Sequence, residues 1–194
     1  MSRTTLRELN GFDQTAAKLS DATLILIDFQ NTYTQGVMEL DGWEQSLDAA
    51  ARLLARARAA GTGIVHVIND GGEGTPYDIR AEIGSIHPKV APHDGEPVVV
   101  KQAPNAFVGT DLDTHLKEGQ DVVIVGWMTH MCVAFTAQGA FLNGNRPTVV
   151  AEATATRSLP VTGTDLDARQ VHHSALATIA DLYGVVVPTQ KEIV

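Results

Sequence analysis

The chain has 194 residues, of which 44% are hydrophobic and 19% charged, and it carries a formal net charge of −9. An acidic chain without a basic stripe is repelled by phosphate backbones, and no apolar run approaches the ~20 residues that span a bilayer. We therefore expect neither a nucleic-acid partner nor a membrane. The composition is that of one globular domain, residues 1–194, in which we interpret residues 1–20 as an N-terminal extension or arm.

Cysteine usage and the N-terminal sequence bear on the cellular compartment. The first twenty residues contain no apolar segment typical of a secretory signal. Cys132 is the only cysteine, which excludes an internal disulfide bond and is typical of a reducing environment. We therefore expect a cytoplasmic protein.

Short runs rich in β-branched residues recur along the chain and predict strands. Most of them are continuously apolar, which is typical of strands buried on both faces of a parallel sheet. The six candidate strands are residues 23–27, 64–68, 97–100, 122–125, 147–151 and 184–187.

Helical patterns lie between these runs, at residues 43–61, 110–119, about 132–143 and about 164–183. Gly61 and Gly184 should end the first and last of them, and Thr110 should cap the second. Asp48 and Arg52 have the i, i+4 spacing of an ion pair. Alternating strands and helices predict βαβ units, and hence a three-layer α/β domain with helices on both faces of the sheet.

The longest stretch without periodicity, residues 69–96, is rich in Gly and Pro. A segment of that length inside a compact domain is usually functional. We expect it to overhang the active-site edge or to form a subunit contact.

Three reactive side chains follow three different candidate strands. Asp28 comes directly after the first strand, Lys101 after the third, and Cys132 a short turn after the fourth. Ligands of open α/β sheets bind at the carboxyl ends of the strands, so an acid, a cation and a thiol should share one edge. A thiol becomes a nucleophile when a base takes its proton or a cation stabilises the thiolate. Each residue alone has an ordinary explanation, as a buried cysteine, a turn cap and a surface lysine.

The segments that carry these residues resemble a known family. "LILIDFQNTY", "VVVKQAPNAF" and "VGWMTHMCVAFTAQGA" are similar to the isochorismatase-like cysteine hydrolases, which include nicotinamidases and N-carbamoylsarcosine amidases. The resemblance runs from about residue 23 to residue 188. It implies a Rossmann-like domain with a six-stranded parallel sheet and helices on both faces. It also implies a triad in which Asp28 is the general base, Lys101 the electrostatic partner and Cys132 the nucleophile.

The resemblance further implies a cis peptide bond between Trp127 and Met128, and an oxyanion hole formed by the backbone N–H groups of Met128 and Cys132. We therefore expect a hydrolase that cleaves the C–N bond of a small amide or carbamoyl compound through a thioester acyl-enzyme. The candidate substrate-binding residues are those near the triad in sequence, Gln30, Tyr33, Phe107, Trp127 and His130. Ordinary packing explains Phe107 and Trp127 equally well.

The nicotinamidase branch of this family carries an Asp-x-His metal motif that the present sequence lacks. Asp70 is followed by Gly71 and Gly72 in "HVINDGGEGTPYDI". Whether His87 or His93 binds a metal stays open, although neither has paired ligand spacing. We predict no catalytic metal and no cofactor.

Two alternatives remain open at the level of the sequence. The first is an isochorismatase-type hydrolase of a vinyl ether, which would not need the thiol. The second is a catalytically silent binding protein with the same fold. A serine hydrolase and a dinucleotide-binding protein are disfavoured, because the chain has neither a G-x-S-x-G elbow nor a G-x-G-x-x-G turn after its first strand. Because the family commonly forms dimers or tetramers, we expect a homodimer or homotetramer.

Overall fold

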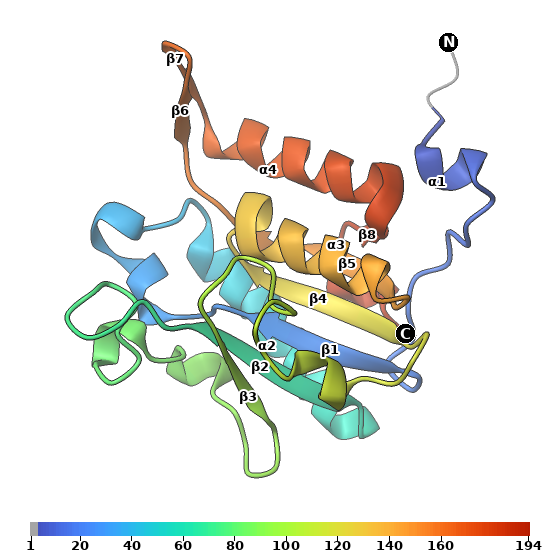
Figure 1. The fold of residues 1–194 in the computed structure, drawn as a ribbon, viewed down its shortest axis with the longest axis horizontal. Coiled ribbons are helices and arrows are strands. Elements are labelled where there is room, and N and C mark those ends of the chain that lie inside the picture. The colour runs from blue at the N-terminus through green and yellow to red at the C-terminus, as the bar shows by residue number, and fades with distance from the viewer. Residues whose placement is uncertain (1–3) are drawn as a thin grey trace.

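A computed structural model describes residues 4–194 and places one six-stranded sheet at its centre (Figure 1). Its strands lie in the order β3-β2-β1-β4-β5-β8, and every neighbouring pair is parallel. The predicted parallel sheet and its six strands are thereby confirmed. The strands are β1 (Ala22–Ile27), β2 (Gly63–Asn69), β3 (Val98–Lys101), β4 (Asp121–Trp127), β5 (Arg146–Ala155) and β8 (Val185–Val187).

Helices cover both faces of this sheet, as the sequence predicts. Helix α2 (Trp43–Ala60) lies on one face, and α3 (Ala134–Leu142) and α4 (Ala168–Thr178) lie on the other (Figure 1). Strand β1 shows how the two cores are divided, because Leu24 and Leu26 pack with α2 whereas Ile25 and Ile27 pack with α3. Gly61 adopts a φ of +68° and ends α2.

The prediction of a helix at residues 110–119 is wrong. The structure has only a short 3₁₀ turn there, at Leu112–His115. The hydroxyl of Thr110 donates to Ala106 O and accepts from the N–H of Leu112. These local side-chain bonds give the backbone an alternative to a helix, which explains the failure of Thr110 as a helix cap.

The start of the last predicted helix, at residue 164, is also wrong. Strands β6 (Leu159–Val161) and β7 (Thr164–Leu166) form a hairpin around Thr162 and Gly163, whose φ angles are +43° and +81°. Positive φ at both positions is the geometry of a tight two-residue hairpin turn. The helix α4 begins only after Asp167, which caps it, and it continues through a π turn at Ile179–Tyr183.

The ion pair predicted between Asp48 and Arg52 is not formed. Asp48 pairs instead with Lys89, which lies in the segment between β2 and β3. Asp48 therefore links that segment to α2 and does not form the predicted ion pair within the helix.

The long segment between β2 and β3 contains only 3₁₀ turns, at Glu82–Gly84 and Pro88–Val90. It lies against the end of β1, since the N–H of Asn31 donates to Ser85 O at 3.0 Å. Its far end is fixed by Glu96, which accepts hydrogen bonds from Arg58 at 2.8 Å and contacts the buried His66 at 2.9 Å. These contacts, led by the Arg58 guanidinium, lower the pKa of Glu96 to about 2.

The described part of the N-terminal segment packs along the molecule as an arm, while residues 1–3 lie outside the described range. It contains a single short helix, α1 (Leu6–Leu9). The Leu6 N–H donates to Asp181, and the Arg7 guanidinium donates to the carbonyl of Leu182. Both contacts anchor the arm at the end of the last helix.

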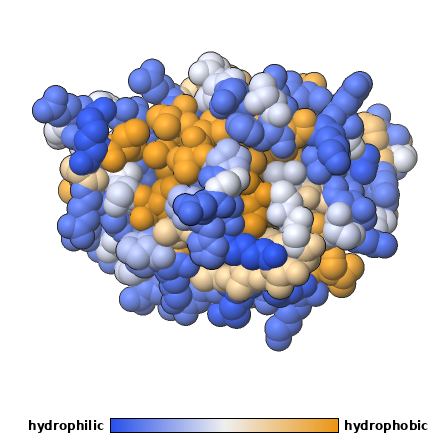
Figure 2. All heavy atoms as spheres, turned by 90° about the horizontal axis from the view of Figure 1, so that it is seen from below, coloured by the Kyte–Doolittle hydropathy of each residue, from blue (hydrophilic) through white to orange (hydrophobic). Residues whose placement is uncertain are grey.

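The surface has one apolar feature of note. Figure 2 shows hydrophobic side chains gathered in a broad patch on the face seen from below. The edge strand β3 lies on the lower side of Figure 1, and its Val98 and Val100 are 39% and 45% exposed. Such an edge is a common site of protein association. Within residues 4–194, no helix has the length and hydropathy needed to cross a bilayer.

Gly126, near the end of β4, allows the backbones of β1 and β4 to approach closely, and we predict that Gly126→Ala strongly destabilises the fold. A Cβ at this position would lie 2.2 Å from Ile27 O, and the φ of Gly126 is +147°. Gly144→Ala is the matched control, because Gly144 also has a positive φ but open space around it. The control should cost about 1–2 kcal/mol for its backbone conformation alone. Gly126→Ala should cost roughly 1–3 kcal/mol more, measured by urea unfolding; equal costs would contradict the close approach.

Candidate active site

The two central strands β1 and β4 mark the point where the strand order of the sheet reverses. From β1 the chain moves through α2 to β2, whereas β4 and β5 lie on the other side of β1. The crevice at such a point is the usual ligand site of an open parallel sheet. Asp28 directly follows β1 and Cys132 follows β4, so both side chains belong to this crevice.

The structure brings Asp28, Lys101 and Cys132 together. The Nζ of Lys101 lies 2.8 Å from Oδ2 of Asp28 and 3.3 Å from Sγ of Cys132. A third acceptor, Oδ1 of Asn69 at the end of β2, lies 3.4 Å from the same nitrogen. The three protons of the ammonium group therefore face three acceptors. All three residues of the predicted triad are buried, with Cys132 7% exposed.

Burial dominates the proton affinities in this cluster. It raises the pKa of Asp28, and the positive charge of Lys101 only partly offsets this effect. Burial alone would lower the pKa of Lys101, but the facing Asp28 and Cys132 raise it overall, so the lysine keeps its charge. Burial and the negative charge of Asp28 raise the pKa of the Cys132 thiol to about 12. The thiol of the free protein is therefore protonated, and Asp28 binds a proton more tightly than an exposed aspartate does.

The segment between β4 and Cys132 has an unusual backbone. The peptide bond between Trp127 and Met128 is cis, as the resemblance implied. Residues Thr129–Val133 then form a π turn that leads directly into α3. Cys132 thus stands in the first turn of a continuous helical segment.

Two of the residues expected to bind substrate occupy buried structural positions. Gln30 is fully buried, and its amide group bonds to backbone atoms of Asn69 and Gly84. Trp127 is also fully buried, packs on the α2 face of the sheet, and donates its indole N–H to Ser46. The structure places neither side chain at an open surface of the site.

Of the other three expected residues, Tyr33 is also fully buried, whereas Phe107 and His130 are partly exposed. Tyr33 is buried, and its pKa is raised by burial and by the nearby charge of Asp28. Phe107 is half-buried at the margin of the core that contains Cys132. His130 is half-buried and its Nδ1 lies 2.5 Å from the hydroxyl of Thr156.

Sequence reasoning missed two residues beside the triad. Tyr77 comes from the long segment, and its ring packs edge-on against Tyr33 with centroids 5.7 Å apart. Arg157 lies two residues beyond β5, and its Nε is buried without a hydrogen-bond partner among the described residues. The charge of Arg157 acts on both Tyr77 and His130, so it is part of the same neighbourhood. The expected strand ends at residue 151 whereas β5 continues to Ala155, so the sequence did not place Arg157 just beyond a strand end.

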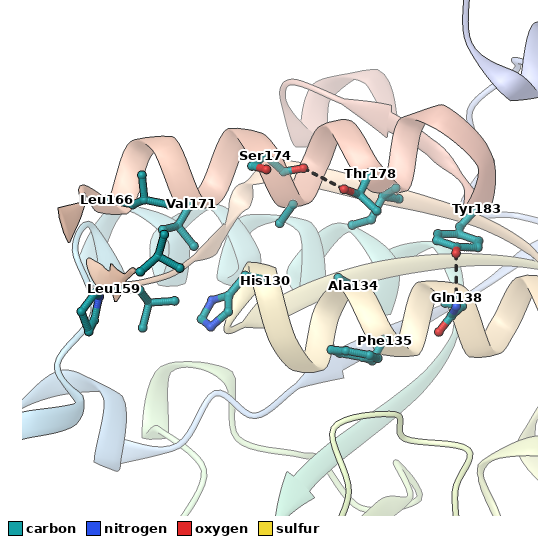
Figure 3. Close-up of a pocket in the computed structure, with 14 residues that line it drawn as sticks. His130, Ala134, Phe135, Gln138, Leu159, Leu166, Val171, Ser174, Thr178 and Tyr183 are labelled. Carbon is teal, nitrogen blue, oxygen red and sulfur yellow. Dashed lines mark hydrogen bonds between the residues drawn. The ribbon is translucent and has the colours of Figure 1, made fainter. Parts of the chain in front are cut away.

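An apolar cavity of about 480 Å³ adjoins the site between α3 and α4. Figure 3 shows His130 in its wall, between Leu159 of the β6–β7 hairpin and Ala134 of α3. Gln138 and Tyr183 form a hydrogen bond of 3.2 Å farther along the wall. The triad itself does not line this cavity.

The histidines that the sequence left open as metal ligands have other contacts. The Nδ1 of His87 accepts the N–H of Lys89, and the backbone of His93 donates to Glu96. Asp70 bonds to Arg80 and to the N–H of Gly72. In the part of the chain that is described, no three His, Cys, Asp or Glu side chains are grouped as a metal site requires.

Comparisons with known proteins agree with this arrangement. The family model described as an isochorismatase domain matches residues 22–191. A crystal structure of an isochorismatase from Pseudomonas putida superimposes with a TM-score of 0.95 at 37% identity and covers 100% of both chains. A secreted isochorismatase effector of Verticillium dahliae is 32% identical over 95% of this chain and 96% of its own. Maleamate amidohydrolase of Pseudomonas putida is 31% identical, over 86% and 83% respectively.

The charges around Cys132 lead to a prediction with opposite signs for two variants. Asp28 raises the thiol pKa and Lys101 lowers it. Asp28→Asn should therefore move the thiol pKa below about 12, and Lys101→Met should move it higher still. The measurement is an equilibrium titration of the thiolate absorbance at 240 nm from pH 7 to 12, with Cys132→Ala as the blank. At a given pH the Asn variant should hold more thiolate than the unaltered protein and the Met variant less; shifts of the same sign would contradict the arrangement.

Proposed function

Because the chain belongs to the isochorismatase family of hydrolases, we propose that it is a cysteine-dependent amidohydrolase that cleaves the C–N bond of a small amide or carbamoyl compound. The observation that carries the proposal is the buried contact of Lys101 Nζ with both Asp28, at 2.8 Å, and Cys132, at 3.3 Å. An acid, a cation and a thiol in contact are the parts that nucleophilic acyl transfer needs.

The proposed reaction has two halves that use the same carboxylate. Asp28 takes the proton of Cys132 as the sulfur attacks the carbonyl carbon, and a tetrahedral oxyanion forms on the N–H groups of Met128 and Cys132. The C–N bond then breaks, and Asp28 returns the proton to the leaving amine. Asp28 next deprotonates a water molecule that attacks the thioester, and the sulfur regains its proton as the acid product leaves.

The raised thiol pKa supports this order of events. A thiol with a pKa of about 12 is not a standing thiolate at neutral pH. It loses its proton only if an adjacent base accepts it while the new bond forms. Asp28 meets that requirement because its own pKa is raised by burial. Lys101 keeps a positive charge beside both groups throughout.

Arg157 supports a narrower substrate class, an amide that also carries a carboxylate. Its guanidinium is a planar fork suited to a carboxylate, and a buried Nε without a partner has a hydrogen bond to give. The name of maleamate amidohydrolase, one of the relatives, denotes a substrate of this kind for that protein.

An isochorismatase-type reaction on a vinyl ether is the alternative within the same family. That reaction would leave Cys132 without a role, although the structure holds its sulfur against a buried lysine. A binding protein without catalytic activity would not require the ammonium group of Lys101 to lie between an acid and a thiol. The triad contact therefore favours amide hydrolysis over both alternatives.

Replacement of the nucleophile separates these functions. Cys132→Ala should abolish hydrolysis of every active compound in a panel of small amides and carbamoyl compounds, because no thioester can form. Cys132→Ser keeps the shape of the side chain and should be at least ~100-fold slower, since a hydroxyl is a poorer nucleophile at this pH. Product formation is followed by ammonia release. Full activity of the Ala variant on a vinyl ether, with no amide turned over by the unaltered protein, would establish the alternative.

The role of Arg157 is tested by a pair of substrates that differ only in charge. Arg157→Gln should lower kcat/KM roughly 10–100-fold for an amide bearing a carboxylate, and little for its methyl ester. Arg157→Lys keeps the charge but not the fork and should give an intermediate loss. An equal loss of kcat/KM for the acid and the ester would show that Arg157 does not bind the carboxylate.

A further inference from the structure

The turn that carries the nucleophile is held by hydrogen bonds from outside the triad. The indole N–H of Trp127 donates to the hydroxyl of Ser46, on α2, at 2.8 Å. The hydroxyl of Thr129 lies 2.9 Å from Nδ1 of His172, on α4. These two contacts approach the turn from opposite layers of the fold, because α2 and α4 cover opposite faces of the sheet.

A third contact comes from the strand beside β4. The hydroxyl of Thr156, directly after β5, lies 2.5 Å from Nδ1 of His130. Three residues of the turn are therefore each held by one polar side chain from a different element. Buried polar groups lose much more than an ordinary contact when such a partner is removed, and Ser46, Thr129 and Thr156 are all buried.

The surroundings of these contacts explain why they matter. Ser46, Thr156 and His172 all line one groove, with a volume of about 640 Å³. The turn residues Trp127, Thr129 and His130 do not line this groove themselves, so the hydrogen bonds of Ser46, Thr156 and His172 connect its wall to the turn. Burial lowers the pKa of His172, which keeps its imidazole neutral at physiological pH.

We propose that Ser46, Thr156 and His172 are positioning residues that hold the turn between Trp127 and Cys132 so that its N–H groups face the developing oxyanion. The inference rests on the proposed function, because it assigns these residues to acyl transfer. They act on the reaction only through the turn, since each bonds to a turn residue. Loss of one of them should slow the steps that form an oxyanion and leave the reactivity of the thiol itself unchanged.

Two chemical probes distinguish these effects. Acylation of Cys132 by p-nitrophenyl acetate passes through a tetrahedral oxyanion, whereas alkylation by iodoacetamide does not. Neither probe depends on knowing the natural substrate. At pH 9, alkylation of the sole described cysteine is counted by intact mass, and acylation is followed by the release of p-nitrophenolate above that of Cys132→Ala.

His172 offers the sharpest set of variants. The amide of Asn can replace Nδ1 of a histidine, the amide of Gln replaces Nε2, and Leu replaces neither. His172→Asn should acylate within about 3-fold of the unaltered protein, while His172→Gln and His172→Leu should acylate roughly 10–100-fold more slowly. All three should be alkylated at the unaltered rate. With an amide substrate, the loss should fall on kcat and leave KM within about 2-fold, as expected for an interaction made only in the transition state.

A second residue keeps the test independent of how well the His172 variants fold. Thr156→Ser retains the hydroxyl and should behave as the unaltered protein, whereas Thr156→Val has the same shape without it and should show the selective loss of acylation. Acylation of Thr156→Val and His172→Leu at the rate of the unaltered protein would overturn the inference. A fall in alkylation as large as the fall in acylation would also overturn it, because it would indicate a disturbed thiol. If the unaltered protein is alkylated but never acylated, the proposed function fails with it.

Discussion

The ammonium group of Lys101 is the point on which the rest of this site depends. A buried cation needs partners on all sides, because transfer of an unpaired charge out of water costs many kcal/mol. Lys101 finds them in Asp28, Cys132 and Asn69, which come from the ends of β1, β4 and β2. The parallel sheet makes this possible, since it brings the carboxyl ends of all its strands to one edge. The sheet topology thus places the partners that the buried ammonium group needs.

The sheet was predictable because most of its strands are continuous apolar runs rich in β-branched residues, a signal that does not depend on the rest of the fold. The two wrong helix predictions, the helix at residues 110–119 and the helix start at residue 164, have a different cause. The hairpin of β6 and β7 is short and depends on positive φ angles at Thr162 and Gly163, one of which is unusual for threonine. The missing helix near Thr110 depends on which atom its hydroxyl contacts. Both are decided by local hydrogen bonds that leave no periodic pattern in the sequence.

The residues of the candidate site that could be predicted are likewise those placed by the strands. Asp28, Lys101 and Cys132 follow strand ends directly, so their convergence could be predicted, although their charges and burial could not. Trp127 was expected at the substrate because it is close to Cys132 in sequence. Val123 and Val125 of β4 already face α2, however, and the two-residue period of a strand carries Trp127 to that face. Tyr77 was missed because it lies in a segment without periodicity, and Arg157 because β5 is longer than the sequence pattern indicates.

The protonated state of Cys132 has a consequence for the chemical durability of this protein. Peroxides and disulfides attack thiolates, and low-pKa cysteines are accordingly the ones that oxidise. A sulfur that is 7% exposed and has a pKa of about 12 presents almost no thiolate to such reagents. In the proposed reaction, the sulfur becomes nucleophilic as Asp28 takes its proton. We therefore expect the buried, protonated sulfur of the free protein to oxidise more slowly than a cysteine of low pKa.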